Sequence, residues 1–171
     1  MLLFRALVFT ILVPGAVTIY VPSILLSGTA PVDDAWRFLG LIPIAAGALG
    51  YLACALEFLM RGEGTPAPFI AKPLRFMIGE EPKNVVQSAL YQRSRNPMYL
   101  SVVTILLGQS LLFESRMLLI YALCTWLAFH LVVIFLEEPH LSDRPGYDEY
   151  RARVPRWLPS RARNRNHSHS R

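Results

Sequence analysis

The stretch MLLIYALCTWLAFHLVVIFL, residues 117–136, decides the fold of this chain. Only Thr125 and His130 interrupt its apolar character over 20 positions. A helix needs about 20 apolar residues to span the hydrocarbon core of a bilayer, where it satisfies all of its own backbone hydrogen bonds. The stretch therefore predicts a membrane-spanning helix near the C-terminal end of the chain.

Three further apolar blocks precede it, at Leu2–Leu26, Trp36–Met60 and Met98–Phe113. Hydrophobic residues make up 53% of the chain and charged residues only 17%, whereas soluble domains carry about 25% charged residues. The short third block is joined to the fourth by residues 114–116, which predicts a helical hairpin. The first block is long and contains two prolines, which favours a retained helix over a cleaved signal peptide. We therefore expect an all-α integral membrane bundle with four transmembrane helices, the last two forming a hairpin.

Positive charge indicates how the helices are oriented. Six Lys or Arg residues lie between positions 61 and 97, and eight Arg residues follow position 136. Positive segments favour the cytoplasm, so both termini and any site beside these segments are expected at the cytoplasmic face of the inner membrane. The net charge of +5 is explained by this topology and by attraction to anionic lipid, and no nucleic acid partner is expected. Residues 1–159 are predicted to form one domain and residues 160–171 a disordered basic tail, whose two histidines make no metal site.

Polar residues gather beside the predicted hairpin in two clusters. Residues 91–99 (YQRSRNPMY) precede the third block, and Glu137 and Glu138 follow the fourth. The hairpin would make the two clusters neighbours in space. Two adjacent carboxylates at a helix C-terminus are disfavoured by the helix dipole, and Arg95 or a cationic ligand would relieve that cost. The alternative is that both glutamates simply face water at the membrane interface.

Four separated segments of the C-terminal half carry a further signal. They are Arg95-Asn96-Pro97-Met98-Tyr99, Glu137-Glu138-Pro139, Tyr147-x-x-Tyr150 and Val154-Pro155-Arg156-Trp157-Leu158-Pro159. In this order, and with Gly64–Phe69 before them, they resemble the membrane methyltransferases. These comprise the isoprenylcysteine carboxyl methyltransferases, their bacterial relatives and the phospholipid N-methyltransferases. The resemblance covers about residues 36–159.

The resemblance implies transfer of a methyl group from S-adenosylmethionine to a lipid-like or amphiphilic acceptor at the cytoplasmic membrane face. Nine residues would then contact the cofactor, below a C-terminal segment that caps it: Tyr91, Arg95, Asn96, Pro97, Tyr99, Glu137, Glu138, Tyr150 and Arg156. Tyr147 would help to close the pocket, and Arg95, Asn96 and Glu138 are the expected catalytic residues. The cofactor carries a sulfonium and an ammonium, which suit the two glutamates, and a carboxylate, which suits Arg95.

The sequence departs from the common family pattern at Ala89, Ser101 and Pro145, and the departures at Ala89 and Ser101 each replace a glycine. These departures leave open a non-catalytic membrane protein that keeps the fold. A small transporter, in which Glu57, His130 and Glu137 relay protons, is a further alternative. The sequence does not determine whether the acceptor atom belongs to a carboxylate, an amine or a thiol, nor does it determine the oligomeric state.

Overall fold

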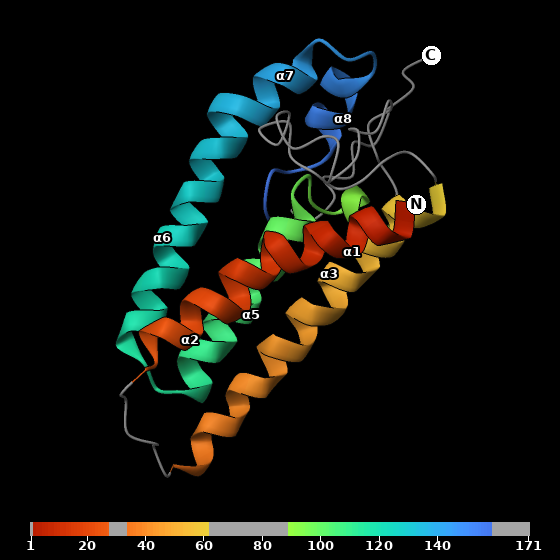
Figure 1. The fold of residues 1–171 in the computed structure, drawn as a ribbon. Coiled ribbons are helices and arrows are strands. Elements are labelled where there is room, and N and C mark those ends of the chain that lie inside the picture. Colours follow the sequence, from red (N-terminus) through yellow and green to blue (C-terminus); the bar gives the residue numbers. More distant parts are fainter. Residues whose placement is uncertain (1, 28–33, 62–88, 159–171) are drawn as a thin grey trace, which may run out of the picture.

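The computed structural model describes residues 2–27, 34–61 and 89–158, and these residues form helices and connecting turns without a strand (Figure 1). Along the chain they form α1 (Leu2–Leu12), the π-helix η1 (Ala16–Tyr20), α2 (Val21–Leu25), the 3₁₀ helix η2 (Ala35–Gly40), α3 (Leu41–Arg61), the 3₁₀ turn η4 (Ala89–Gln92), α5 (Pro97–Leu112), α6 (Arg116–Val132), the π-helix η5 (Val133–Glu137), α7 (Glu138–Ser142) and α8 (Tyr147–Arg153). The all-α prediction is confirmed for this part of the chain. The predicted basic tail, residues 160–171, and the Gly64–Phe69 motif lie outside the described residues.

Two helical stretches, Ala35–Glu57 and Arg116–Ser142, are long and apolar enough to cross a membrane. Only 22% of each apolar window is buried inside the protein, whereas a core helix of a soluble protein is mostly buried. The apolar stretches Thr10–Leu25 and Pro97–Leu112 are shorter than a full span. Two of the four predicted spans therefore have the required length, and the crossing of the other two stays a prediction.

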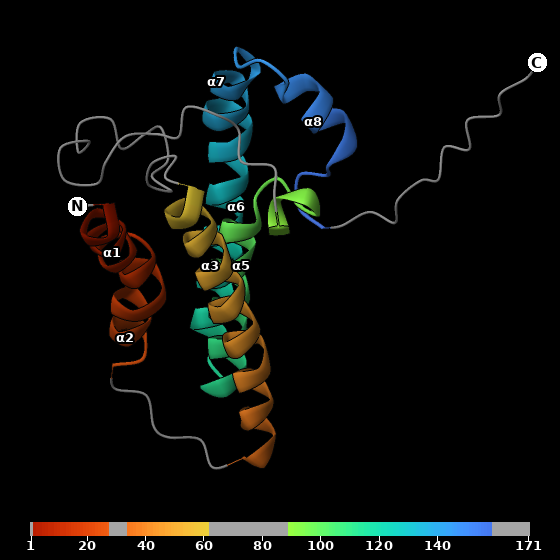
Figure 2. The same ribbon diagram turned by 90° about the vertical axis from the view of Figure 1, so that its right-hand side faces the viewer.

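Helix α5 packs between α3 and α6 (Figure 2). Glycines bring α5 close to α3 and to η2, which precedes it: a Cβ atom on Gly47 would lie 2.6 Å from the carbonyl oxygen of Ser101, and one on Gly108 would lie 2.6 Å from that of Gly40 at the end of η2. Small residues allow such close backbone approach between membrane helices. The hydroxyl of Ser101 donates to the carbonyl of Pro97 at 2.8 Å, so this departure from the family pattern is accommodated within the helix contact.

The predicted hairpin forms between α5 and α6. Its turn contains Glu114 in the left-handed region, with φ of 46°, and Ser115 caps α6 by accepting from the backbone N–H of Leu118 at 3.3 Å. Because the two helices are antiparallel, the start of α5 and the end of α6 lie toward the same end of the bundle. The start of α1 and the end of α3 lie toward that end as well (Figure 1).

Each of the two π-helices immediately precedes a proline-containing turn. In η1 the N–H of Val21 reaches back five residues to the carbonyl of Ala16, just before Pro22. Pro22 has no N–H to offer the carbonyl of Thr18, and the side-chain amide of Gln109 on α5 donates to that carbonyl at 2.7 Å. In η5 the N–H of Glu138 likewise donates to the carbonyl of Val133, five residues back, and Pro139 follows directly. The carbonyl group freed by Pro22 thus ties the N-terminal segment to α5.

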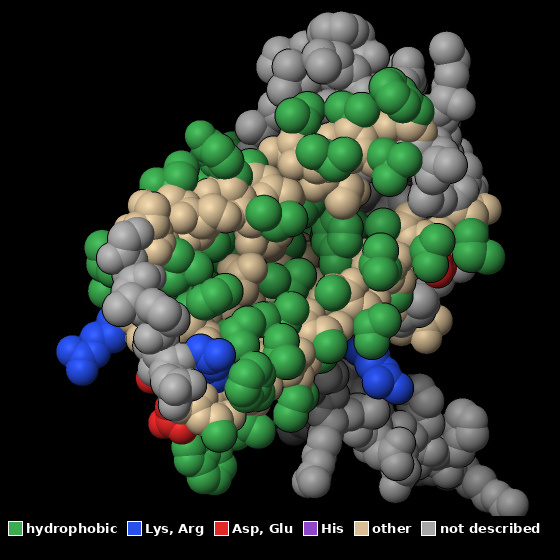
Figure 3. Space-filling view, turned by 60° about the horizontal axis from the view of Figure 1, so that its bottom comes forward, with side chains coloured by type: hydrophobic (Ala, Val, Ile, Leu, Met, Phe, Trp, Pro, Cys, Tyr) green, Lys and Arg blue, Asp and Glu red, His purple; other side chains and the backbone are tan. Residues whose placement is uncertain are grey.

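A cavity of about 630 Å³ separates the N-terminal segment from α3 and α5. Its lining is mainly apolar and includes Ile11, Ile19, Ala48, Val102 and Ile105. Figure 3 shows a face of the molecule on which hydrophobic side chains surround a hollow. This groove has the volume that small-molecule sites in proteins usually have, about 300–1,000 Å³.

Candidate functional site

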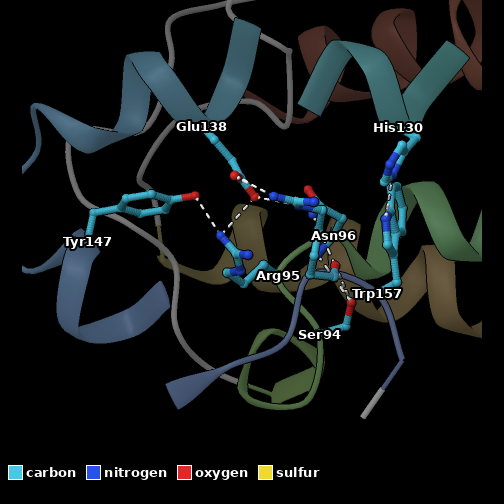
Figure 4. Close-up of polar contacts among 8 residues, drawn as sticks. Ser94, Arg95, Asn96, His130, Glu138, Tyr147 and Trp157 are labelled. Carbon is cyan, nitrogen blue, oxygen red and sulfur yellow. Dashed lines mark hydrogen bonds and ion pairs between the residues drawn. The ribbon is translucent and has the colours of Figure 1, made fainter. Parts of the chain in front are cut away.

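The end of the bundle brings the two polar clusters into direct contact (Figure 4). Arg95, which precedes α5, and Glu138, which begins α7, form an ion pair with 2.9 Å between Nη1 and Oε1. Each side chain is only 8% exposed. The hairpin therefore produces the neighbourhood that the sequence predicts, and Glu138 does not simply face water.

Arg156 completes this ion pair from the C-terminal segment. Its Nε donates to Oε1 of Glu138 at 2.7 Å and its Nη2 donates to Oε2 at 2.8 Å, a bidentate arrangement that fixes both groups. The hydrogen bonds to Glu138 raise the pKa of the Arg156 guanidinium. Two guanidinium groups thus share one carboxylate, which leaves the cluster with one excess positive charge.

One donor of this cluster lacks a hydrogen-bond partner. The Nε atom of Arg95 is buried and has no partner among the residues that the structure describes. A buried donor without an acceptor costs free energy, and a ligand oxygen that accepts its hydrogen bond would remove that cost. The excess positive charge and this donor together suit the carboxylate of a bound ligand.

Residues 94–96 hold the C-terminal segment beside Arg95 through one backbone and two side-chain hydrogen bonds. The N–H of Arg95 donates to the carbonyl of Pro155 at 2.9 Å. The side chains of Ser94 and Asn96 both donate to the carbonyl of Arg156, at 3.2 and 3.1 Å. Asn96 is buried, and Pro97 follows it at the first turn of α5, where its missing N–H costs nothing.

The two glutamates have different partners. The hydroxyl of Tyr99 donates to Oε1 of Glu137, and its ring packs on that of Phe129 with 4.6 Å between the centroids. Glu138 instead faces Arg95 and Arg156. The two adjacent glutamates thus differ in their contacts: a phenol donates to Glu137, whereas two guanidinium groups pair with Glu138.

Tyrosines from η4 and α8 enclose the same end. Tyr147 accepts a hydrogen bond from Nη1 of Arg95 at 3.1 Å, and the hydroxyl of Tyr150 donates to the carbonyl of Tyr91 at 2.7 Å. Burial raises the pKa of Tyr91, Tyr147 and Tyr150, so all three stay neutral hydrogen-bonding phenols. Gly146 begins α8 in the left-handed region with φ of 80°, which a glycine adopts without strain. All nine predicted site residues thus lie at one end of the bundle, and their contact with a cofactor stays a prediction.

Two contacts at this end were not predicted from the sequence. The hydroxyl of Ser94 donates to the carbonyl of Arg156, and Trp157 donates from Nε1 to Nδ1 of His130 on α6 at 2.9 Å. The position of Trp157, directly after Arg156, is the one signal that could have indicated its place. Ala89, another of the three departures noted in the sequence, has no described side chain.

Comparison with known proteins adds one family. The model of the phospholipid methyltransferase family matches residues 45–146, more than half of the chain. The match runs from within α3 to Gly146, directly before α8, and includes Arg95 and Glu138, whereas Tyr150 and Arg156 follow it. No curated protein and no solved structure matches the chain.

Proposed function

The chain belongs to the phospholipid methyltransferase family, and we propose that it transfers a methyl group from S-adenosylmethionine to an amphiphilic or lipid-like acceptor at the cytoplasmic membrane face. Family membership supports a membrane methyltransferase in general. The observation that carries the finer proposal is the Arg95–Glu138–Arg156 cluster, with its excess positive charge and the unpartnered Nε of Arg95.

The residues fit the charged groups of this cofactor. Arg95 and Arg156 would hold its carboxylate, and Glu137, one residue from the cluster, would face its cationic groups. When bound, S-adenosylmethionine supplies a methyl group activated by a sulfonium. Glu138, whose oxygens are taken up by the two arginines, would act by keeping both guanidinium groups in place.

Methyl transfer requires mainly that donor and acceptor are aligned and kept from water. The buried Asn96, together with Ser94, fixes the segment that carries Arg156, so it contributes to this alignment. Tyr147 and Tyr150 cover the cluster from α8 and exclude water on that side. The chain thus provides positioning and charge, which are the contributions that such a reaction needs from a protein.

The groove beside α3 supports a lipid-like acceptor. Tyr51 lines the groove, and further along α3 the helix contacts η4, which carries Tyr91 beside the cluster. An acyl or prenyl chain in the groove would thus place an attached head group toward the cofactor end. The positively charged segments on either side of the hairpin support a cytoplasmic position for that end.

Cofactor binding by the purified chain in detergent tests the proposal. Calorimetry with S-adenosylhomocysteine is expected to show binding to the wild type and about tenfold weaker binding to Arg95→Lys, which keeps the charge but lacks Nε and the planar fork. Arg153→Lys, the same change at an exposed position of α8, serves as the control. Absence of wild-type binding at millimolar concentration would refute the proposal.

Transfer of a labelled methyl group into a total lipid extract identifies the acceptor class. Incorporation into the lipid fraction supports the lipid-like acceptor. Cofactor binding without incorporation into any lipid or small molecule would instead favour a non-catalytic relative.

A further inference from the structure

The C-terminal segment Val154–Trp157 is anchored on both of its sides. On one side, residues 94–96 donate three hydrogen bonds to the carbonyl groups of Pro155 and Arg156. On the other side, consecutive side chains contact the long helix formed by α6, η5 and α7. Arg156 pairs with Glu138 on α7, and Trp157 bonds His130 on α6 (Figure 4).

The π-helix η5 is the reason why these two contacts lie on one face. His130 and Glu138 are eight residues apart, and in a regular α-helix this spacing would place them about 80° apart around the axis. The five-residue π segment accommodates one extra residue in its turn, which returns Glu138 to the face of His130. Without it Glu137, seven residues after His130, would occupy that face. The irregular turn thus matches the helix to two adjacent residues of the segment.

His130 is held in place by aromatic rings. Its imidazole stacks on Trp126 one turn earlier, with 5.3 Å between centroids and 18° between planes. The indole of Trp157 lies 5.9 Å from the imidazole and 6.4 Å from Trp126. An indole N–H is a donor only, so its bond to Nδ1 requires that this nitrogen carries no proton. Stacking on Trp126 therefore fixes the position of the His130 ring, and the hydrogen bond from Trp157 selects its tautomer.

We propose that His130 is a positioning residue: by accepting the hydrogen bond of Trp157 it holds the neighbouring Arg156 on Glu138 and so keeps the cofactor end pre-organised. This inference rests on the proposed methyltransferase function. Arg156 is a long side chain, 28% exposed, and if it were not already held, cofactor binding would have to bear the conformational entropy of ordering it. The hydrogen bond of the neighbouring indole lowers that entropy cost of cofactor binding, because it helps to fix the backbone of the segment before the cofactor arrives.

Three variants, which change the ring and the hydrogen bond separately, distinguish this role from simple packing. His130→Phe keeps a ring that stacks on Trp126 but offers no acceptor. His130→Asn loses the ring, yet its side-chain oxygen can take the place of Nδ1. Trp157→Phe removes the donor and keeps a ring. If only packing matters, His130→Phe is the milder change, whereas the hydrogen bond makes His130→Asn the milder one.

Two measurements on the full chain in detergent test the inference. Hydrogen exchange of residues 154–158 reports the anchoring directly and needs no cofactor; it is expected to accelerate in His130→Phe and Trp157→Phe and to stay near wild type in His130→Asn. Affinity for S-adenosylhomocysteine is expected to fall about three- to tenfold in His130→Phe, the effect of one lost hydrogen bond, and less than about twofold in His130→Asn. The double variant His130→Phe/Trp157→Phe should bind no more weakly than either single variant, since it leaves no orphaned polar group.

The outcomes distinguish this inference from the proposed function. Equal losses of affinity in His130→Phe and His130→Asn, or unchanged exchange in both, would overturn the positioning role. If the wild type binds no cofactor, the function fails while the exchange data still decide whether His130 anchors the segment. Should His130→Phe fail to fold, Trp157→Phe provides the same comparison from the donor side.

Discussion

Replacing Glu138 with glutamine tests how much the Arg95–Glu138–Arg156 cluster contributes to the stability of the fold. Glu138 is 6% exposed, forms an ion pair with Arg95 and accepts two hydrogen bonds from Arg156. In the amide one oxygen becomes an NH₂ group, so a donor then faces a guanidinium donor. Arg95, whose side chain is 8% exposed, keeps its charge but loses its counter-ion.

The magnitude follows from the burial of the two arginines. Breaking a buried ion pair by removing one partner costs about 3–5 kcal/mol, because the remaining charge is left uncompensated. Arg156 is 28% exposed, so the loss of its pairing with Glu138 contributes about 0–1 kcal/mol, the value typical of surface ion pairs. We therefore expect Glu138→Gln to lower the free energy of unfolding by about 3–5 kcal/mol, mainly through Arg95. In a chain of this length each kcal/mol shifts the unfolding midpoint by about 2–4 °C, so a fall of about 6–20 °C is expected.

Thermal unfolding in one detergent, followed by circular dichroism, measures this shift. Glu149→Gln is the matched control, since Glu149 is an exposed residue of α8 and should shift the midpoint by no more than about 2 °C. The double variant Glu138→Gln/Arg95→Gln should recover part of the loss, because it removes the uncompensated charge. A midpoint for Glu138→Gln within about 2 °C of wild type, or a double variant that is no more stable than the single one, would refute the reasoning. Cofactor affinity should fall at least about tenfold in Glu138→Gln, since hydrogen bonds to charged groups are worth about 1.5–3 kcal/mol.

Three further predictions concern the groove, the buried phenols and the helix contact. Ala48→Phe, which fills the groove, should raise KM for a lipid acceptor and leave cofactor affinity unchanged, whereas Ala45→Phe on the exposed side of α3 should change neither; equal effects in a methyl-transfer assay would contradict the groove assignment. Because burial raises the pKa of Tyr147 and Tyr150 in the folded chain, their contribution to stability is complete below the unfolded value of about 10 and is lost as pH rises through the folded values. The temperature midpoint of unfolding should therefore decrease as the pH rises beyond about 10, and a midpoint that is unchanged up to about pH 11 would contradict this. Gly108→Ala should lower the midpoint by about 2–12 °C, because the new Cβ would lie 2.6 Å from the carbonyl of Gly40 and overpacking costs about 1–3 kcal/mol; a variant as stable as wild type would show that α3 and α5 can separate freely.

The hairpin and the meeting of the two clusters could be predicted from the sequence. Block lengths identify the helices, and the short connection at residues 114–116 leaves the helices no arrangement but antiparallel neighbours. The contact between Arg95 and Glu138 then follows from topology, because their positions flank the hairpin. Such inferences need only the apolar pattern and chain connectivity.

The partners of individual side chains could not be predicted in the same way. Glu137 and Glu138 are identical in sequence terms, and which of them faces Arg156 depends on one extra residue in η5. The same turn lets Trp157 bond His130 while Arg156 pairs with Glu138. For the first block, the hydropathy pattern suggests one span, but its prolines divide it into α1, η1 and α2. Local backbone irregularities of this kind leave little trace in an apolar pattern.

The charge balance of the Arg95–Glu138–Arg156 cluster would link its stability to the binding of an anionic ligand. Two arginines share one carboxylate, and one of their buried donors has no partner within the described chain. Such a cluster is poorly compensated on its own, because the excess charge sits where water is largely excluded. An anionic group that reaches Arg95 would supply the missing countercharge and the missing acceptor together. The same groups that make the free protein less stable would then strengthen its affinity for a carboxylate-bearing cofactor, and ligand binding would return that stability to the folded chain.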